Sequence, residues 1–292
     1  MGNNHSNVAN TAQTFGSKGD SRLSPTGSLC EPFLFLDILK NCGTLTFIMD
    51  IYIYGKHAVL EALEAGMLAR ALVAPGRKDA DLEKRLRAGG AKIAPLEPSK
   101  LPREIDKEAV HQGVVGVISS LKLVADYKDF IQKLEVTPDT SLVIFGEVQD
   151  PHNVGAVIRS AAAFGVSGVL IPEHNQAQVT GAVIKVSAGM AFKVPLVSIG
   201  NVNTIARDLK EKGFWVYGLA GEAEQNLDTE VFDRPTVFIV GNEGEGLREK
   251  TREVCDVLLK IPMHSRCESL NVSVSTAVAL QAWSRQHGGA LR

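Results

Sequence analysis

The chain has 292 residues, 45% of them hydrophobic and 22% charged, with a formal net charge of −2. This composition is typical of a globular protein, and the length provides enough chain for two modest domains. The net charge excludes a strongly basic protein that attracts nucleic acid through its total charge. Any RNA-binding face therefore has to be a local basic patch.

Residues 1–48 are predicted to form a disordered extension, because they are rich in Asn, Ser, Gly and Thr and show little hydrophobic periodicity before Phe33. Met49 stands immediately before the patterned sequence, and we interpret it as the natural start of the protein. A short regulatory or targeting tail is the alternative. The acidic residues of this segment and its single arginine, Arg22, argue against a mitochondrial transit peptide.

Residues 49–120 are predicted to form a small α/β domain, because stretches with helical spacing alternate with apolar runs. Helices are expected at Gly55–Gly66 and Asp79–Ala88, and β segments at Leu68–Ala74 and His111–Ser119.

The second of these helices and the residues after it carry a group of basic side chains that can contact RNA phosphates. They are Lys84, Arg85, Arg87 and Lys92. Asp79, Asp81 and Glu83 balance them, so a solvated helix face explains the charge pattern equally well.

Residues 121–140 are interpreted as a charged linker with a short helix at Tyr127–Leu134, and residues 141–292 as a second domain in which strands and helices alternate. Strands are expected at Leu142–Phe145, Gly168–Ile171, Pro195–Ser198, Phe214–Ala220, Thr236–Val240 and Asp256–Ile261. Helices are expected at Asn153–Phe164, Val183–Ala188, Asn201–Lys212, Leu247–Val254 and Asn271–Gln286. This alternation predicts an α/β fold with an open, mostly parallel sheet covered by helices on both faces.

Three polar motifs follow strands of this second domain: Glu147–Asp150 after the first, Gly241–Gly246 after the fifth and Met263–Asn271 after the sixth. Open α/β sheets bind ligands outside the carboxyl ends of their strands. The motifs are therefore expected to meet in one site.

The helix after the first motif has an apolar face, made of Val154, Val157, Ile158 and Ala161. Arg159 points roughly the opposite way and is available to a ligand or a partner subunit, although an exposed, salt-bridging arginine is the alternative. Asn153 falls in the first turn, where helix capping is the alternative to a role in a site.

The second motif, Gly241-Asn-Glu-Gly-Glu-Gly246, has glycines in the order G-x-x-G-x-G and fails the dinucleotide-binding fingerprint. A glycine-rich turn lets the main chain approach a ligand closely, which suits an adenosine packed against the backbone.

The third motif places Glu268, Ser269, Asn271 and Ser273 at the start of the last helix. Unpaired N–H groups and the positive end of the helix dipole favour a carboxylate or a phosphate there. Simple capping by Ser269 or Asn271 is the alternative.

The three motifs, in this order, resemble those of the SpoU/TrmH family of SPOUT methyltransferases, and within it the branch that methylates the ribose 2′-hydroxyl of a guanosine in large-subunit ribosomal RNA. The resemblance extends from Tyr52 to the C-terminus. It implies an L30e-like RNA-binding domain at residues 49–120 and a SPOUT methyltransferase domain at 141–292 with a trefoil knot. It also implies S-adenosylmethionine as the methyl donor, ribosomal RNA as the substrate and a homodimer.

The same resemblance assigns roles to individual residues. The active-site residues are Asn153, Arg159, Glu243, Ser269 and Asn271, and the donor contacts are Ala220, Gly241, Ile261 and Leu270. Some descriptions of the family make the arginine a general base. Because a guanidinium is a poor base, we favour contact of Arg159 with an RNA phosphate and polarisation of the hydroxyl. One departure stands at Ser265, where family members often have glycine, so the path of that loop is expected to differ.

No metal site is expected, because methyl transfer from a sulfonium requires none and the four cysteines lie far apart without a Cys-x-x-Cys pair. Cys267 is not expected to act as a nucleophile, since no His/Asn arrangement accompanies it. The unpaired cysteines favour the reducing cytoplasm. No apolar run reaches the roughly 18 residues that a membrane span requires.

Two alternatives to a ribosomal RNA methyltransferase remain open from the sequence: a transfer RNA 2′-O-methyltransferase, and a non-catalytic RNA-binding or ribosome-assembly factor with the same fold. A factor that only binds RNA would not need the five polar active-site residues that the resemblance assigns.

Overall fold

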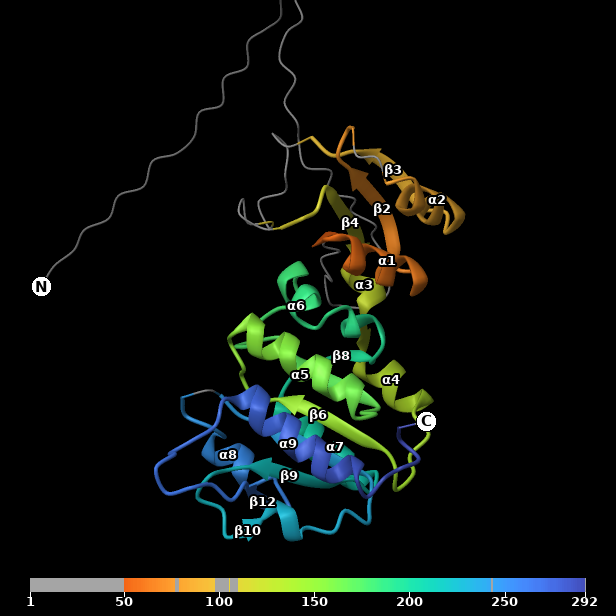
Figure 1. Ribbon diagram of the computed structural model, residues 1–292. Helices are drawn as coiled ribbons and strands as arrows, with labels where there is room; N and C mark the ends of the chain where they lie inside the picture. The colour runs from red at the N-terminus through yellow and green to blue at the C-terminus, as the bar shows by residue number, and fades with distance from the viewer. Residues whose placement is uncertain (1–49, 77–78, 98–104, 106–109, 243, 292) are drawn as a thin grey trace, which may run out of the picture. The chain divides into compact units, whose positions relative to one another are not determined.

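The computed structural model describes residues 50–76, 79–97, 105, 110–242 and 244–291, all within the unit Leu45–Arg292 (Figure 1). The extension predicted at residues 1–48 lies outside the described residues, as does Glu243. No helix in the described ranges is long and apolar enough to cross a membrane.

The first part of the described chain forms a small mixed sheet in the order β1-β4-β2-β3. Its strands are β1 (Asp50–Tyr54), β2 (Leu68–Val73), β3 (Lys92–Pro95) and β4 (Val114–Ser119). β4 pairs antiparallel with β1 and β2, whereas β3 pairs parallel with β2. Strands β1 and β3 were not predicted. β1 carries a period-two pattern, with Ile51 and Ile53 buried, that could have indicated it, whereas β3 has four residues and ends in a proline.

Both helices predicted in this part are confirmed, as α1 (Lys56–Glu64) and α2 (Ala80–Ala88). The Asp79 side chain caps α2 by accepting from the Leu82 N–H at 3.1 Å. Two of the basic residues proposed for phosphate contact are ion-paired instead: Arg85 with Glu64 at 2.6 Å and Arg87 with Glu83 at 3.8 Å. This supports the solvated-face alternative for those two arginines.

The second part contains an eight-stranded sheet, counted over the described residues, in the order β10-β12-β9-β11-β6-β7-β8-β5. Its strands are β5 (Val124–Asp126), β6 (Ser141–Phe145), β7 (Gly168–Pro172), β8 (Leu196–Ile199), β9 (Trp215–Leu219), β10 (Gln225–Asn226), β11 (Thr236–Val240) and β12 (Val257–Lys260). Every pairing of these strands is parallel. The predicted α/β fold with a mostly parallel sheet is confirmed.

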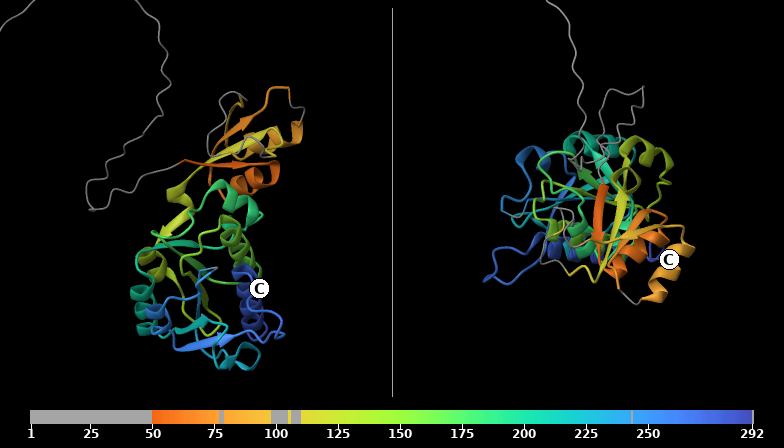
Figure 2. Two further views of the ribbon diagram at one scale, coloured as in Figure 1. Left: turned by 90° about the vertical axis from the view of Figure 1, so that its left-hand side faces the viewer. Right: turned by 90° about the horizontal axis from the view of Figure 1, so that it is seen from above.

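Helices cover both faces of this sheet, as the left view of Figure 2 shows. The side chains of β6 point alternately to the two faces of the sheet. On one face, Val143 and Phe145 pack with α5 (Pro151–Ala163) and α9 (Val272–Ser284). Leu142 and Ile144 pack with α4 (Tyr127–Lys133) and α7 (Val202–Glu211). Because both faces are buried, the strand is apolar at nearly every position. The shorter helical segments are α3 (Ser120–Leu123), α6 (Gly181–Val186), α8 (Glu249–Arg252), η2 (Met190–Phe192) and η3 (Leu227–Thr229).

Two predicted segments differ from the structure. The stretch interpreted as a linker contains β5, whose three residues pair with β8 at the sheet edge and are too few to show a pattern. The helix expected at Leu247–Val254 is reduced to α8, because Arg248 is extended with ψ 149° and Leu247 packs into the core instead.

Candidate active site

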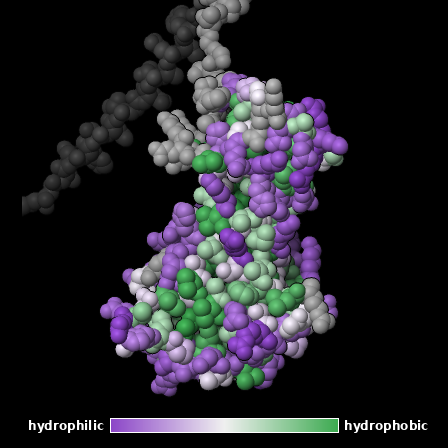
Figure 3. Space-filling model, in the orientation of Figure 1, coloured by the Kyte–Doolittle hydropathy of each residue, from purple (hydrophilic) through white to green (hydrophobic). Residues whose placement is uncertain are grey.

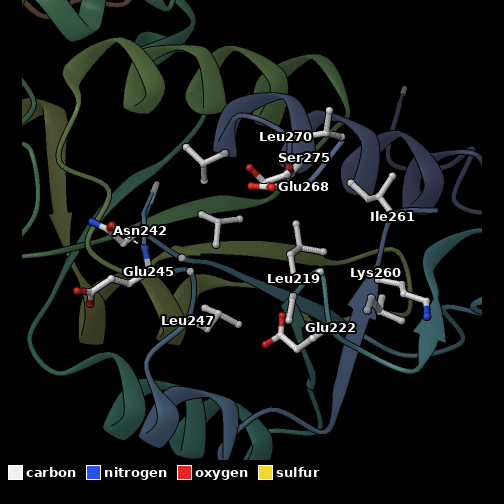
Figure 4. A pocket seen from close by; sticks show the side chains of 18 of the residues that line it. Leu219, Glu222, Asn242, Glu245, Leu247, Lys260, Ile261, Glu268, Leu270 and Ser275 are labelled. Atoms are coloured by element: carbon white, nitrogen blue, oxygen red, sulfur yellow. Dashed lines mark hydrogen bonds between the residues drawn. The ribbon is translucent and has the colours of Figure 1, made fainter. Parts of the chain in front are cut away.

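A cavity of about 300 Å³ lies at the carboxyl ends of β9, β11 and β12, against the start of α9 (Figure 4). Four of its lining residues are those predicted for donor binding, and Ser269 lines it too. The four are Ala220, Gly241, Ile261 and Leu270. Because the strands are parallel, the loops that follow them meet on one edge of the sheet, as the sequence predicted.

The walls of the cavity combine apolar and charged side chains. Leu219, Leu247 and Ile261 provide apolar surface, and Figure 4 shows the Leu219 and Glu268 side chains pointing into the space. Lys260 also lines the cavity. The remaining charged side chains described there are Glu245 and the ion pair of Glu222 with Arg252. An apolar pocket with a few polar groups is typical of small-molecule sites.

The glycine-rich second motif forms a tight turn closed by two backbone hydrogen bonds. The Asn242 N–H donates to the Gly246 carbonyl at 2.9 Å, and the Gly246 N–H donates to the Asn242 carbonyl at 3.0 Å. A Cβ on Gly241 would lie 2.3 Å from the carbonyl carbon of Gly246. The turn therefore needs glycine at position 241 so that the chain can double back on itself.

The helix after the first motif meets the third motif through Asn153 and Asn271. The Asn271 Nδ2 donates to the Asn153 Oδ1 at 2.9 Å, and the Asn271 Oδ1 accepts from the Ser273 N–H at 2.9 Å. Asn271 is therefore the cap of α9, as one alternative held, and also a link to α5. The capping alternative for Asn153 is wrong, because Asp150 caps α5 by accepting from the His152 N–H at 2.8 Å.

Arg159 lies apart from the cavity. It is exposed on α5, and the helix face turned away from it is buried in the core, as predicted. The residues described around the cavity do not include Arg159. The structure thus brings the four residues predicted for donor binding and Ser269 into one cavity and joins Asn153 to Asn271, while Arg159 stands on the neighbouring helix surface.

Several cavity residues were missed by sequence reasoning. Leu219 and Lys260 end β9 and β12, and Glu222 follows β9, so their positions at strand ends could have identified them. Asn242 stands inside the second motif but was given no role. Gln176, which contacts the first motif, follows β7 and gave no signal in the sequence.

The two described cysteines, Cys255 and Cys267, are both free thiols. Burial raises the pKa of the Cys255 thiol to about 12, so this thiol stays protonated at neutral pH, and Cys267 is exposed. Among the described residues, no three His, Cys, Asp or Glu side chains are grouped to hold a metal ion.

Comparison with known proteins identifies the family. Residues 140–281 match the SpoU rRNA methylase family, and residues 52–124 match the RNA 2′-O ribose methyltransferase substrate-binding family. The chain is 39% identical to 23S rRNA (guanosine-2′-O-)-methyltransferase RlmB of Xanthomonas campestris pv. campestris, over 82% of this chain and 98% of that protein. It is likewise 39% identical to RlmB of Pseudomonas putida, over 80% of this chain and 96% of that protein.

Among solved structures, the SpoU methyltransferase AviRb from Streptomyces viridochromogenes in complex with AdoMet aligns with a TM-score of 0.72 and 25% identity, covering 81% of this chain and 90% of that one. The family resemblance is thereby confirmed over residues 52–124 and 140–281. This chain belongs to the SpoU rRNA methylase family.

Proposed function

We propose that this protein is an S-adenosylmethionine-dependent RNA methyltransferase that methylates the ribose 2′-hydroxyl of a guanosine in large-subunit (23S) ribosomal RNA. The observation that carries the proposal is the cavity formed by the predicted donor-binding residues, in a chain 39% identical to a protein of that name over 98% of its length. The presence of Asn153, Arg159, Ser269 and Asn271 favours an enzyme over a binding factor.

The cavity fits the donor in size and chemistry. Its volume of about 300 Å³ falls at the lower end of the range for small-molecule pockets, about 300–1,000 Å³. The backbone of Ala220 and Gly241 and the side chains of Ile261 and Leu270 would hold the adenosine. Glu268 offers a negative charge to a cationic ligand. When bound, S-adenosylmethionine supplies a methyl group activated by its sulfonium.

The remaining site residues are proposed to act on the RNA. Asn153 and Asn271, joined at 2.9 Å, hold the start of α5 against the start of α9. Arg159, exposed on α5, binds an RNA phosphate and polarises the 2′-hydroxyl through its fixed charge. The proton leaves the hydroxyl for that phosphate or for water, because a guanidinium does not accept it. Glu243 and Ser269 complete the proposed active site.

A homodimer belongs to the same proposal. Apolar side chains gather over α5 and α9 on the face seen in Figure 3, where Val274 is 47% exposed and Val278 37%. The hollow between the two helices is lined by Ala156, Ser160, Phe164, Ser273, Val274, Ala277, Val278 and Gln281. Exposed apolar patches of this kind mark interaction sites. Arg159 precedes Ser160 and therefore borders the surface that a second copy would cover.

Val278→Asp is expected to convert the dimer to a monomer. A carboxylate buried without a partner costs about 3–5 kcal/mol, which weakens association by 100-fold or more. Sedimentation velocity over a range of protein concentrations measures the change. Val231→Asp, at a site 69% exposed and outside α5 and α9, is the control and should remain dimeric. A monomeric wild type, or a dimeric Val278→Asp protein, would rule out this surface as the interface.

The finer features of the fold are part of the proposal as well. They are an L30e-like RNA-binding domain at 49–120, a linker at 121–140 and a methyltransferase domain at 141–292 with a trefoil knot. The separate sheets and the family matches to residues 52–124 and 140–281 support this division. A ribosomal RNA substrate and the unpaired cysteines support a cytoplasmic location.

Mapping of 2′-O-methylation in cells with and without the gene tests the proposed function. We expect one guanosine of large-subunit ribosomal RNA to lose its methyl group in the deletion strain and to regain it on complementation. Loss at a transfer RNA position instead would favour the transfer RNA alternative. Unchanged methylation in both RNAs, with RNA binding retained, would favour the non-catalytic factor.

A further inference from the structure

Asn242 connects two loops at the centre of the large sheet. It follows β11, and its side chain contacts the segment Gly146–Val148 that follows β6. Strands β6 and β11 are neighbours, and the chain order reverses between them: β7 and β8 extend the sheet on one side, β9 and β12 on the other. Open α/β sheets hold their ligand sites at such a reversal, so a contact there joins the two halves of the site.

The carboxamide of Asn242 forms hydrogen bonds in two directions. Its Oδ1 accepts from the N–H of Gly244 at 2.8 Å and from the N–H of Glu245 at 3.3 Å. Its Nδ2 donates to the carbonyl oxygen of Glu147 at 3.0 Å. The first set orders the turn that lines the cavity, and the second reaches across to the neighbouring loop. An asparagine can do both, whereas an ionised aspartate can only accept.

Glu147 has a backbone conformation that requires support. Its φ of +71° lies in the left-handed region, which residues other than glycine rarely adopt. Such a conformation persists only where its surroundings fix it. Arg248 pairs with the Glu147 carboxylate at 2.6 Å. The buried Gln176 accepts from the Val148 N–H at 2.8 Å and donates to the Val148 carbonyl at 2.6 Å.

This segment leads directly into α5. Asp150 caps the helix, and the first turn carries Asn153, which is bonded to Asn271 at the start of α9. Since only Gln149 separates Val148 from the cap, a change in the path at Glu147 displaces the start of α5 relative to the cavity. The hydrogen bonds of Asn242 therefore determine the position of the residues on α5 relative to the turn Gly241–Gly246.

We propose that Asn242 is a positioning residue for methyl transfer: it fixes the loop before α5 against the turn that lines the donor cavity. This inference rests on the proposed function and deepens it. Correct placement of the reacting groups supplies much of the rate of such reactions, and a displacement of about 1 Å costs roughly 100-fold.

Asn242→Asp removes one of the two sets of hydrogen bonds and keeps the other. The carboxylate still accepts from the Gly244 and Glu245 N–H groups, but it cannot donate to Glu147 and repels that carbonyl oxygen. We expect kcat on ribosomal RNA to fall by about 10- to 100-fold, while the Kd for S-adenosylmethionine, measured by calorimetry, changes by much less than kcat. Hydrogen exchange should become faster at the amide of Val148 and in the first turn of α5.

Two further variants complete the experiment. Asn242→Ala removes both sets of bonds, so donor affinity and kcat should both fall. Asn201→Asp makes the same chemical change at the cap of α7, where the Asn201 Oδ1 accepts from the Thr204 N–H at 3.0 Å, and should behave as wild type.

Wild-type kcat in Asn242→Asp, or a loss of donor affinity as large as the loss of kcat, overturns the proposal. If the wild type itself binds no S-adenosylmethionine and methylates no ribosomal RNA, the proposed function fails. The hydrogen-exchange comparison still decides in that case whether Asn242 holds the loop, because it needs neither donor nor RNA.

Discussion

Arg159→Ala is expected to lower kcat for methyl transfer to ribosomal RNA by about 10²- to 10³-fold, the usual effect of removing one fixed donor that stabilises developing charge. The Arg159 guanidinium lies outside the donor cavity, exposed on α5. The Kd for S-adenosylmethionine should therefore stay unchanged. Single-turnover transfer of a labelled methyl group gives the rate, and calorimetry gives the affinity.

Arg207→Ala provides the matched control, because Arg207 is also an exposed arginine on a helix, α7, which covers the opposite face of the sheet. It should keep the wild-type rate. Arg159→Lys retains the charge but loses the planar, bidentate geometry, so only part of the rate should return. An Arg159→Ala protein with full activity would contradict the proposed role of the arginine and leave polarisation of the hydroxyl to other groups.

The position of Arg159 connects catalysis with assembly. Within one chain it is separate from the cavity, and it is next in sequence to Ser160, which lines the hollow between α5 and α9. If two copies pair through that surface, each arginine stands at the interface. The Val278→Asp monomer should then lose activity while keeping its affinity for the donor, since no residue that lines the hollow over α5 and α9 also lines the cavity.

The sequence predicted most of the large sheet because its strands are buried on both faces and its helices are amphipathic. β11 matches the predicted range Thr236–Val240, and α7 differs from its prediction only at its ends. Short elements escaped prediction for a physical reason: β5 has three residues and depends on pairing with β8. The strand β5 forms because it pairs with β8, although its own sequence shows no strand pattern.

The candidate site shows the same division between local pattern and tertiary contact. Ile261 and Leu270 were assigned to the donor site by the resemblance of their motif to the family, and both line the cavity. The hydrogen bond between Asn153 and Asn271 joins residues 118 positions apart. The left-handed Glu147 is held by Asn242 and Arg248, and the next residue, Val148, by Gln176. Contacts of that kind are fixed by the packed sheet, so no spacing in the chain indicates them.

Gly241→Ala is expected to weaken binding of S-adenosylmethionine by 100-fold or more. The added Cβ would lie 2.3 Å from the carbonyl carbon of Gly246, 2.4 Å from its oxygen and 2.6 Å from the Leu247 nitrogen. All three are backbone atoms, which cannot move aside as a flexible side chain could. The turn that forms one wall of the cavity therefore has to open. Overpacking of this kind typically costs about 1–3 kcal/mol of stability. Calorimetric titration with the donor and thermal unfolding measure the two effects.

Gly200→Ala is the control for this experiment, because Gly200 does not line the cavity and a Cβ there would meet nothing within 4 Å. Its donor affinity and melting temperature should match those of the wild type. Equal weakening in both variants would mean that any added methyl group at this edge of the sheet disturbs binding. Wild-type affinity in Gly241→Ala would mean that the donor does not depend on the turn, and the cavity between β9, β11 and β12 would then not be its site.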